Sequence, residues 1–192
     1  NDEAILKEKP KSTITADAFM MGEGRLSATF RFDMLSTENY FNLDVSLEAM
    51  DLQHFNQIME PIAFVTIKKG KNNRLNMTAL ANEDVAIGSM YFQYEDLKIS
   101  LINKNTYDTK VTGPVIGSFF ANTFIINKKN PRLLTMKEGE IYFERDKYKS
   151  IFNYWSKIFF SGIVSSIGAK SNKKEIRKYE KMEEDEITRT GN

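Results

Sequence analysis

Residues 25–34, with the sequence RLSATFRFDM, indicate the fold class of this chain of 192 residues. From Leu26 to Met34 every second residue is apolar and the residues between are polar, which is the period of a strand that buries one face and exposes the other. Gly22 and Gly24 can supply the positive φ angles of a tight loop just before this strand. We therefore predict a β-hairpin whose arms are residues 13–21 and 25–34.

The same alternation recurs further along the chain. Residues 41–47 repeat it, and Asp51 can then cap a short helix that Pro61 is expected to end. The alternation returns in four later stretches: 63–67, 75–79, 85–94 and 97–101. We expect a turn at residues 70–73, between the first and the second of these stretches. The predicted fold class is mainly β, a curved antiparallel sheet that forms a groove or a half-open, taco-like sandwich, with a short crossover helix and C-terminal helices.

The segment that follows is predicted to be less regular. Residues 103–110 are polar and indicate a loop, whereas residues 115–126 mix small and aromatic residues and favour a helix. After the breaker Asn130-Pro131, residues 133–144 indicate a last hairpin or strand.

The end of the chain predicts two helices of opposite character. Ser150 begins a helix with a broad apolar face that runs to Ile167, and the highly charged residues 170–192 indicate a solvated helix. We accordingly expect two parts: a β groove domain with short helices over residues 1–148, and the apolar-faced helix with its charged tail over residues 149–192.

The composition excludes several classes of function. The 27 basic and 26 acidic residues leave a net charge of +1, which gives no overall attraction to the phosphates of nucleic acid. There is no cysteine, and the single histidine, His54, has neither a second histidine nor an acidic cluster beside it, so no metal site or catalytic relay is predicted. We expect a non-enzymatic protein without metal or cofactor that binds no nucleic acid.

The acidic residues Glu138, Glu140, Glu144 and Asp146 are interleaved with basic ones, as on a solvated surface. A hydrolase would need two carboxylates held at a set separation, and an unrecognised hydrolase of this kind stays open as a rival interpretation.

The chain contains no apolar run of about eighteen residues or more, and residues 1–11 lack the apolar core of a signal peptide. It opens on Asn1 instead of methionine. We therefore expect a mature form or an excised C-terminal fragment of a longer protein.

The apolar face that the strands share must be covered. The sheet can fold back on itself, helices can lie across it, or an apolar ligand can fill part of a concave face. The apolar helix that begins at Ser150 has a similar ambiguity, since the same face suits packing on the sheet or lying in a membrane interface next to lysines that meet anionic lipid. Its candidate membrane-contacting or partner-contacting residues are Trp155, Phe159, Phe160, Ile163, Lys170, Lys173 and Lys174.

Several short motifs in order carry a resemblance to a known family. They include Glu60-Pro61 after the helix, Gly88-Ser89-Met90, the run from Tyr94 to Ile99, residues 119–124 with Asn130-Pro131, and the pair of runs 142–147 and 152–155. Over roughly residues 20 to 168 the chain resembles the C-terminal region of AsmA-like envelope proteins of the Bacteroidetes type.

The resemblance implies a periplasmic protein whose full-length form is anchored in the inner membrane and shields phospholipid acyl chains between the inner and outer membranes. It implies no catalytic residues. The candidate residues that line the lipid groove are Phe30, Phe32, Leu43, Val45, Val65, Ile67, Leu75, Met77, Leu97 and Ile99. The alternative is a sealed, non-catalytic envelope module that docks a membrane or protein partner through its C-terminal helix and binds no lipid.

Overall fold

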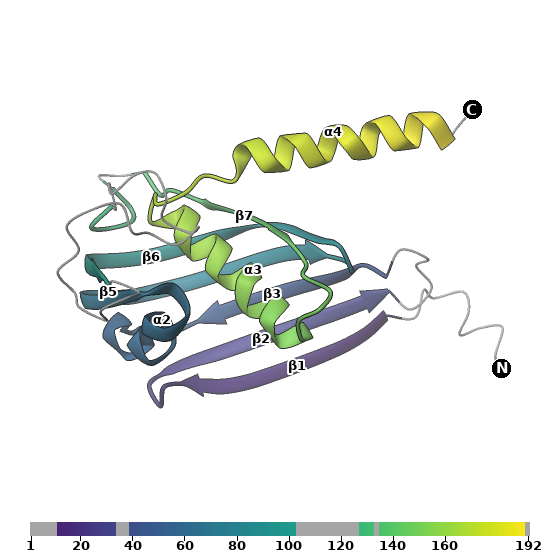
Figure 1. Cartoon of the computed structure of the whole chain (residues 1–192). Coiled ribbons are helices and arrows are strands. Elements are labelled where there is room, and N and C mark those ends of the chain that lie inside the picture. The colour runs from purple at the N-terminus through teal and green to yellow at the C-terminus, as the bar shows by residue number, and fades with distance from the viewer. Residues whose placement is uncertain (1–10, 34–38, 103–126, 133–134, 191–192) are drawn as a thin grey trace, which may run out of the picture.

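The computed structural model describes residues 11–33, 39–102, 127–132 and 135–190, and shows a mainly β fold, an open antiparallel sheet that carries helices on one face (Figure 1). Its seven strands follow the order β1-β2-β3-β5-β6-β7, with the short β4 paired to β5. The predicted fold class is confirmed. The strands are β1 Lys11–Met20, β2 Gly24–Asp33, β3 Phe41–Leu47, β4 Met50–Asp51, β5 Val65–Ala81, β6 Val85–Leu101 and β7 Gly139–Glu144.

The predicted hairpin is confirmed by β1 and β2, which pair from Lys11 opposite Asp33 to Met20 opposite Gly24. Gly22 in its loop has a φ angle of 81°, which explains the glycine there. Phe30 on β2 lies opposite Leu43 on β3, so the apolar positions of successive strands share one face. That face is the concave side of the sheet and holds the core.

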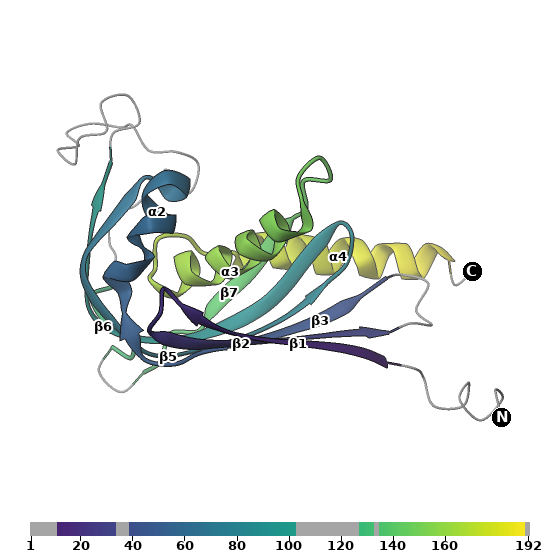
Figure 2. The ribbon, with the colours of Figure 1, turned by 90° about the horizontal axis from the view of Figure 1, so that it is seen from below.

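The turn expected at residues 70–73 is wrong, because β5 runs through it without a break and pairs with β6 over most of its length. The irregularity is a series of register shifts between Ile67 and Arg74, at which Gly70 has a φ angle of 155°. A bulge uses the same conformational freedom of glycine as a turn but bends the strand and increases its twist. Figure 2 shows the result, since β5 and β6 curl upward at the end of the sheet that carries α2.

The crossover helix consists of a 3-10 turn, η1 Leu52–Phe55, followed by α2 Asn56–Ala63. Asp51 caps it as expected, since its carboxylate accepts a hydrogen bond from the backbone nitrogen of Gln53. The expectation that Pro61 ends the helix is wrong: Pro61 lies inside α2, which ends at Ala63, and the C-cap residue Phe64 has a left-handed φ angle of 55°. Proline fits the helical φ angle and removes only one hydrogen bond this close to the end of the helix.

The side chain of Asn56 fixes this helix on the sheet. Its Nδ2 donates to the carbonyl of Ile67 at 2.9 Å, and its Oδ1 accepts from the Ile67 nitrogen at 2.7 Å. The amide group thus makes the pair of bonds that a neighbouring strand would make with β5.

Helix α3, Ile151–Ser166, crosses the concave face diagonally from β2 toward β7 (Figure 1). Ser150 caps its start and Gly168, with a φ angle of 85°, follows its end, which confirms the predicted apolar helix. Tyr154 and Ile158 are buried in the same apolar cluster as the strands. Of the two alternatives for this helix, packing on the sheet is therefore the one observed. The predicted division of the chain at residue 148 stays a prediction.

Helix α4, Lys173–Thr190, extends alongside β7, away from the concave face (Figures 1 and 2). The ring of Tyr179 lies 6.5 Å from that of Tyr142, and Glu183 accepts a hydrogen bond of 3.2 Å from the hydroxyl of Tyr40. The charged helix predicted for residues 170–192 is confirmed within these bounds. The loop and helix predicted over residues 103–126 lie outside the described residues.

The outer edge of β7 is closed by side chains of the helical segment instead of by another strand. The Ser165 hydroxyl accepts from the Glu140 nitrogen at 2.9 Å, and the Ser161 hydroxyl bonds both the nitrogen and the carbonyl of Tyr142. Asn172 donates to the Glu140 carbonyl at 2.8 Å. The backbone groups at this edge therefore have partners, as buried polar groups require.

Replacing Ser165 by alanine is expected to destabilise the protein by about 1–3 kcal/mol, because the Glu140 nitrogen loses its partner in a buried setting. Ser165 is fully buried, and its hydroxyl also donates to Glu140 Oε2 at 2.6 Å. The matched control is Ser156→Ala in the same helix, where the serine is exposed and bonds only its own helix among the described residues. Equal free energies of unfolding for the two variants in urea titrations would contradict the role given to Ser165.

Candidate functional site

An apolar trough of about 320 Å³ remains open on the concave face between α2, α3 and the strands β1 to β3. Among the described residues that line it, no side chain is titratable, and the polar side-chain groups are the hydroxyl of Ser156 and the indole nitrogen of Trp155. The trough is lined by Ala16, Met20, Leu26, Ala28, Phe30, Leu43, Val45, Phe55, Ile58, Met77, Trp155, Ser156, Phe159 and Phe160.

The floor of the trough follows from the register of the sheet. Ala16, Ala28, Val45 and Met77 lie opposite one another across β1, β2, β3 and β5, so they form one row on the concave face. The two members nearest the β1 edge are alanines, whose small side chains leave space above them. The small side chains of these two alanines therefore leave the floor of the trough uncovered near the β1 edge.

Helix α3 provides the opposite wall. The ring of Trp155 lies 4.4 Å from that of Phe30, and the rings of Phe159 and Phe160 meet edge to face at 6.0 Å. These aromatic side chains face the sheet. The exposed large apolar side chain of α3 is instead Phe152, which is 69% exposed.

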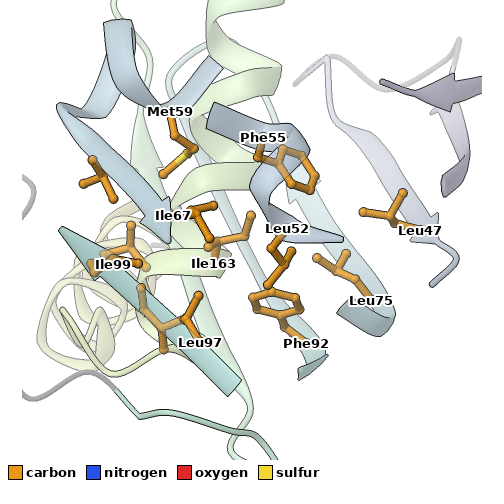
Figure 3. Close-up of a pocket in the computed structure, with 13 residues that line it drawn as sticks. Leu47, Leu52, Phe55, Met59, Ile67, Leu75, Phe92, Leu97, Ile99 and Ile163 are labelled. Carbon is orange, nitrogen blue, oxygen red and sulfur yellow. The ribbon is translucent and has the colours of Figure 1, made fainter. Parts of the chain in front are cut away.

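A second, smaller cavity of about 40 Å³ lies farther along the concave face, where η1, α2 and α3 cover β5 and β6 (Figure 3). Figure 3 shows Phe55 and Met59 pointing into it from one side and Ile163 from another. A cavity of this size has room for a few water-sized molecules and not for an acyl chain. We regard it as a packing defect of the core.

The ten residues predicted to line a lipid groove therefore fall into three sets. Four of them, Phe30, Leu43, Val45 and Met77, line the trough. Five line the small cavity, covered by helices: Val65, Ile67, Leu75, Leu97 and Ile99. Phe32 lines neither, and its ring packs beside those of Phe30 and Phe41 at 6.4 and 5.6 Å.

The residues predicted on the C-terminal helix are divided as well. Trp155, Phe159 and Phe160 line the trough, and Ile163 lines the small cavity. The lysines lie beyond the end of α3 and are exposed: Lys170, Lys173 and Lys174. Lys173 pairs with Glu140 at 3.6 Å, so one of the three takes part in closing the β7 edge.

Sequence reasoning missed several lining residues, and some of them had a signal. Leu26 and Ala28 have the same strand parity as Phe30, so the alternation already placed them on the same face. Ala16 and Met20 are less apparent, since β1 is rich in threonine and alanine. Phe55 and Ile58 belong to the apolar face of the crossover helix, but nothing in the sequence indicates that this helix borders the trough.

Two titratable side chains, those of His54 and Glu140, take part in contacts between elements of the fold. His54 Nε2 lies 2.8 Å from Glu23 Oε1, and both side chains are largely exposed, so they join η1 to the β1–β2 hairpin. No group of three or more possible metal ligands occurs in the described ranges. Burial acts to raise the pKa of Glu140, but the Ser165 hydroxyl and the charge of Lys173 hold that pKa below its usual value. Glu140 is thus an ionised partner of the β7 edge.

None of the described helices combines the length and the apolar character that crossing a bilayer requires. What the geometry defines is an open, helix-bordered β sheet with an apolar trough. The chain matches no protein-family model, no curated protein and no solved structure.

Proposed function

We propose that the trough binds the acyl chain of a lipid, and that the protein takes part in carrying phospholipid between the membranes of a cell envelope. The observation that supports this proposal is an apolar trough of about 320 Å³ that the described helices leave open. The AsmA-like resemblance supplies the phospholipid, the periplasmic location and the anchor of the full-length protein. Because the trough is lined by apolar side chains, we expect its ligand to be uncharged over most of the ligand's length.

The energetics suit a carrier that must also release its lipid. Burial of each methylene group contributes about 0.8 kcal/mol, so about six methylenes in the trough contribute about 5 kcal/mol. Part of this gain is lost as translational and conformational freedom on binding. The result is reversible binding, and the headgroup stays in water because no charged side chain of the described residues lines the trough.

The test uses Trp155, which is the only tryptophan of the chain and lines the trough. Phospholipid vesicles whose acyl chains carry bromine should quench its fluorescence, since bromine quenches indole on contact. The matched control is the same lipid without bromine, which should leave the intensity nearly unchanged.

Quenching that matches the quenching of a free tryptophan derivative would contradict the proposal. A chain that is folded, shows no such quenching and carries no phospholipid in organic extracts would favour the sealed docking module instead. Vesicle flotation separates a third case, in which Trp155 is quenched because the whole protein adsorbs to the membrane surface. In that case quenching disappears with soluble, short-chain brominated lipid below its micelle concentration.

A further inference from the structure

The two edge strands of the sheet differ in the partners of their outward backbone groups. At the β7 edge, side chains from α3 and Asn172 bond the outward backbone groups. At the other edge, β1 is the last strand in the order, and no described residue pairs with its outer side. All its side chains from Ser12 to Phe19 are exposed. A row of unpaired backbone donors and acceptors is a template for a further strand.

β1 also lacks two of the features that protect natural edge strands from pairing, a proline and a bulge. Its ten residues contain no proline, and its pairing with β2 runs without a register shift. The side that faces the trough is free of charge, since Ile14, Ala16, Ala18 and Met20 lie opposite trough-side residues of β2. Ile14 is 55% exposed there. Such a strand is suited to continue the sheet instead of ending it.

The sequence of β1 is complementary to itself in one antiparallel alignment. With Ile14 opposite Ile14, Thr13 lies opposite Thr15 and Lys11 lies opposite Asp17 at both ends. Lys11 and Asp17 are the only charged residues of β1, and their charges have opposite signs, so this register places an opposite charge across from each of them in the sequence. Shifting the alignment to place Ala16 opposite Ala16 loses both pairs, because Asp17 then faces Thr15.

Asp17 has an oxygen to contribute to such a pair. Among the described residues, Arg25 and Ser27 both donate to its Oδ1. These contacts place the carboxylate on the convex face of the sheet.

We propose that the outer edge of β1 pairs with β1 of a second copy of this chain, in the alignment centred on Ile14. The two-fold axis is then perpendicular to the sheet, so both concave faces lie on the same side. Ile14 and Ala16 of the second copy then extend the trough floor across the junction. The dimer goes beyond the proposed function and needs no lipid; only the lengthening of the trough rests on that function.

A single cysteine at the axis tests the alignment, because the chain has no cysteine of its own. Directly opposite residues in an antiparallel pair have Cα atoms roughly 4.5–5.5 Å apart, within the range that a disulfide spans. Under mild oxidation Ile14→Cys should form a covalent dimer about a hundredfold faster than a collision between monomers at micromolar concentration allows.

The matched controls are Thr13→Cys, which lies opposite Thr15 in this alignment, and Phe19→Cys, which is 70% exposed in the free chain but outside the paired span. Crosslinking of all three at the same rate would overturn the proposal.

Sedimentation equilibrium gives a test without a crosslink. The wild-type chain, free of lipid, should approach twice the monomer mass as its concentration rises. Ile14→Lys places two lysines opposite each other and should remain a monomer, whereas Phe19→Lys carries the same change of charge outside the paired span and should still dimerise. A wild-type chain that is monomeric at every concentration would overturn the dimer and leave lipid binding in the trough untouched.

Discussion

Alanine at position 139 is expected to push α3 away from β7 and to lower the free energy of unfolding by about 3 kcal/mol. A methyl group on Gly139 would lie 2.5 Å from the carbonyl oxygen of Gly162 and 2.9 Å from the nitrogen of Ser166. Both are backbone atoms of α3 and have no rotamer through which to give way. For a chain of this length, a loss of about 3 kcal/mol corresponds to a fall in Tm of about 6–12 °C.

The control for this prediction is Gly162→Ala, on the other side of the same contact. The closest atom to its new methyl group is Met90 Cε at 2.7 Å, which is the far end of a flexible side chain. Alanine also favours the interior of a helix by up to about 1 kcal/mol over glycine, which offsets part of the strain. Thermal unfolding should therefore show a smaller loss for Gly162→Ala, and an equal loss would contradict the rigid contact at Gly139.

The strands and their faces could be predicted from the sequence because alternation is a local signal. Phe30, Leu43, Val45 and Met77 were assigned to one face from their spacing alone, and the register of the sheet places them together. The N-terminal caps of both apolar helices were equally local, since Asp51 and Ser150 each bond a nitrogen two or three residues ahead.

The long hairpin of β5 and β6 could not be predicted because glycine serves turns and bulges alike. Gly70 stands among lysines and asparagines, as in a turn, but the strand continues because pairing with β6 resumes after each register shift. The buried side chain of Asn72 also holds β5 in place at this point, because its Nδ2 donates to the Glu48 carbonyl at 2.7 Å and so joins the bulge to the end of β3. That contact joins residues far apart in the sequence, and local patterning carries no trace of it.

Which part of the apolar face stays open is also a non-local property. It depends on the diagonal path of α3, and this path depends on the close approach of Gly139 to Gly162 and on the serines that bond β7. In the sequence these serines are only polar interruptions of an apolar helix. The strand pattern therefore predicted an apolar face correctly but assigned Val65, Ile67 and Leu97 to a groove, although helices cover them.

Tryptophan at position 28 is expected to abolish most of the lipid binding of the trough while leaving the fold intact. Ala28 lies in the middle of the floor and is only partly buried, so a larger side chain can extend upward into the space between the sheet and α3. If the indole displaces about four methylenes of the acyl chain, the loss is about 3 kcal/mol, or roughly a hundredfold in Kd. Ala28 is on β2, so the β1 edge is not altered.

The measurement is native mass spectrometry of the protein with a long-chain fatty acid, since the added tryptophan would confuse a fluorescence assay. Thr29→Trp is the matched control: Thr29 is the next residue of β2 and lies on the convex face opposite Asp44, away from the trough. It should bind the fatty acid as the wild type does. If Ala28→Trp keeps wild-type affinity at unchanged Tm, the trough is not the binding site, because the indole can extend only into the space that the acyl chain is proposed to occupy.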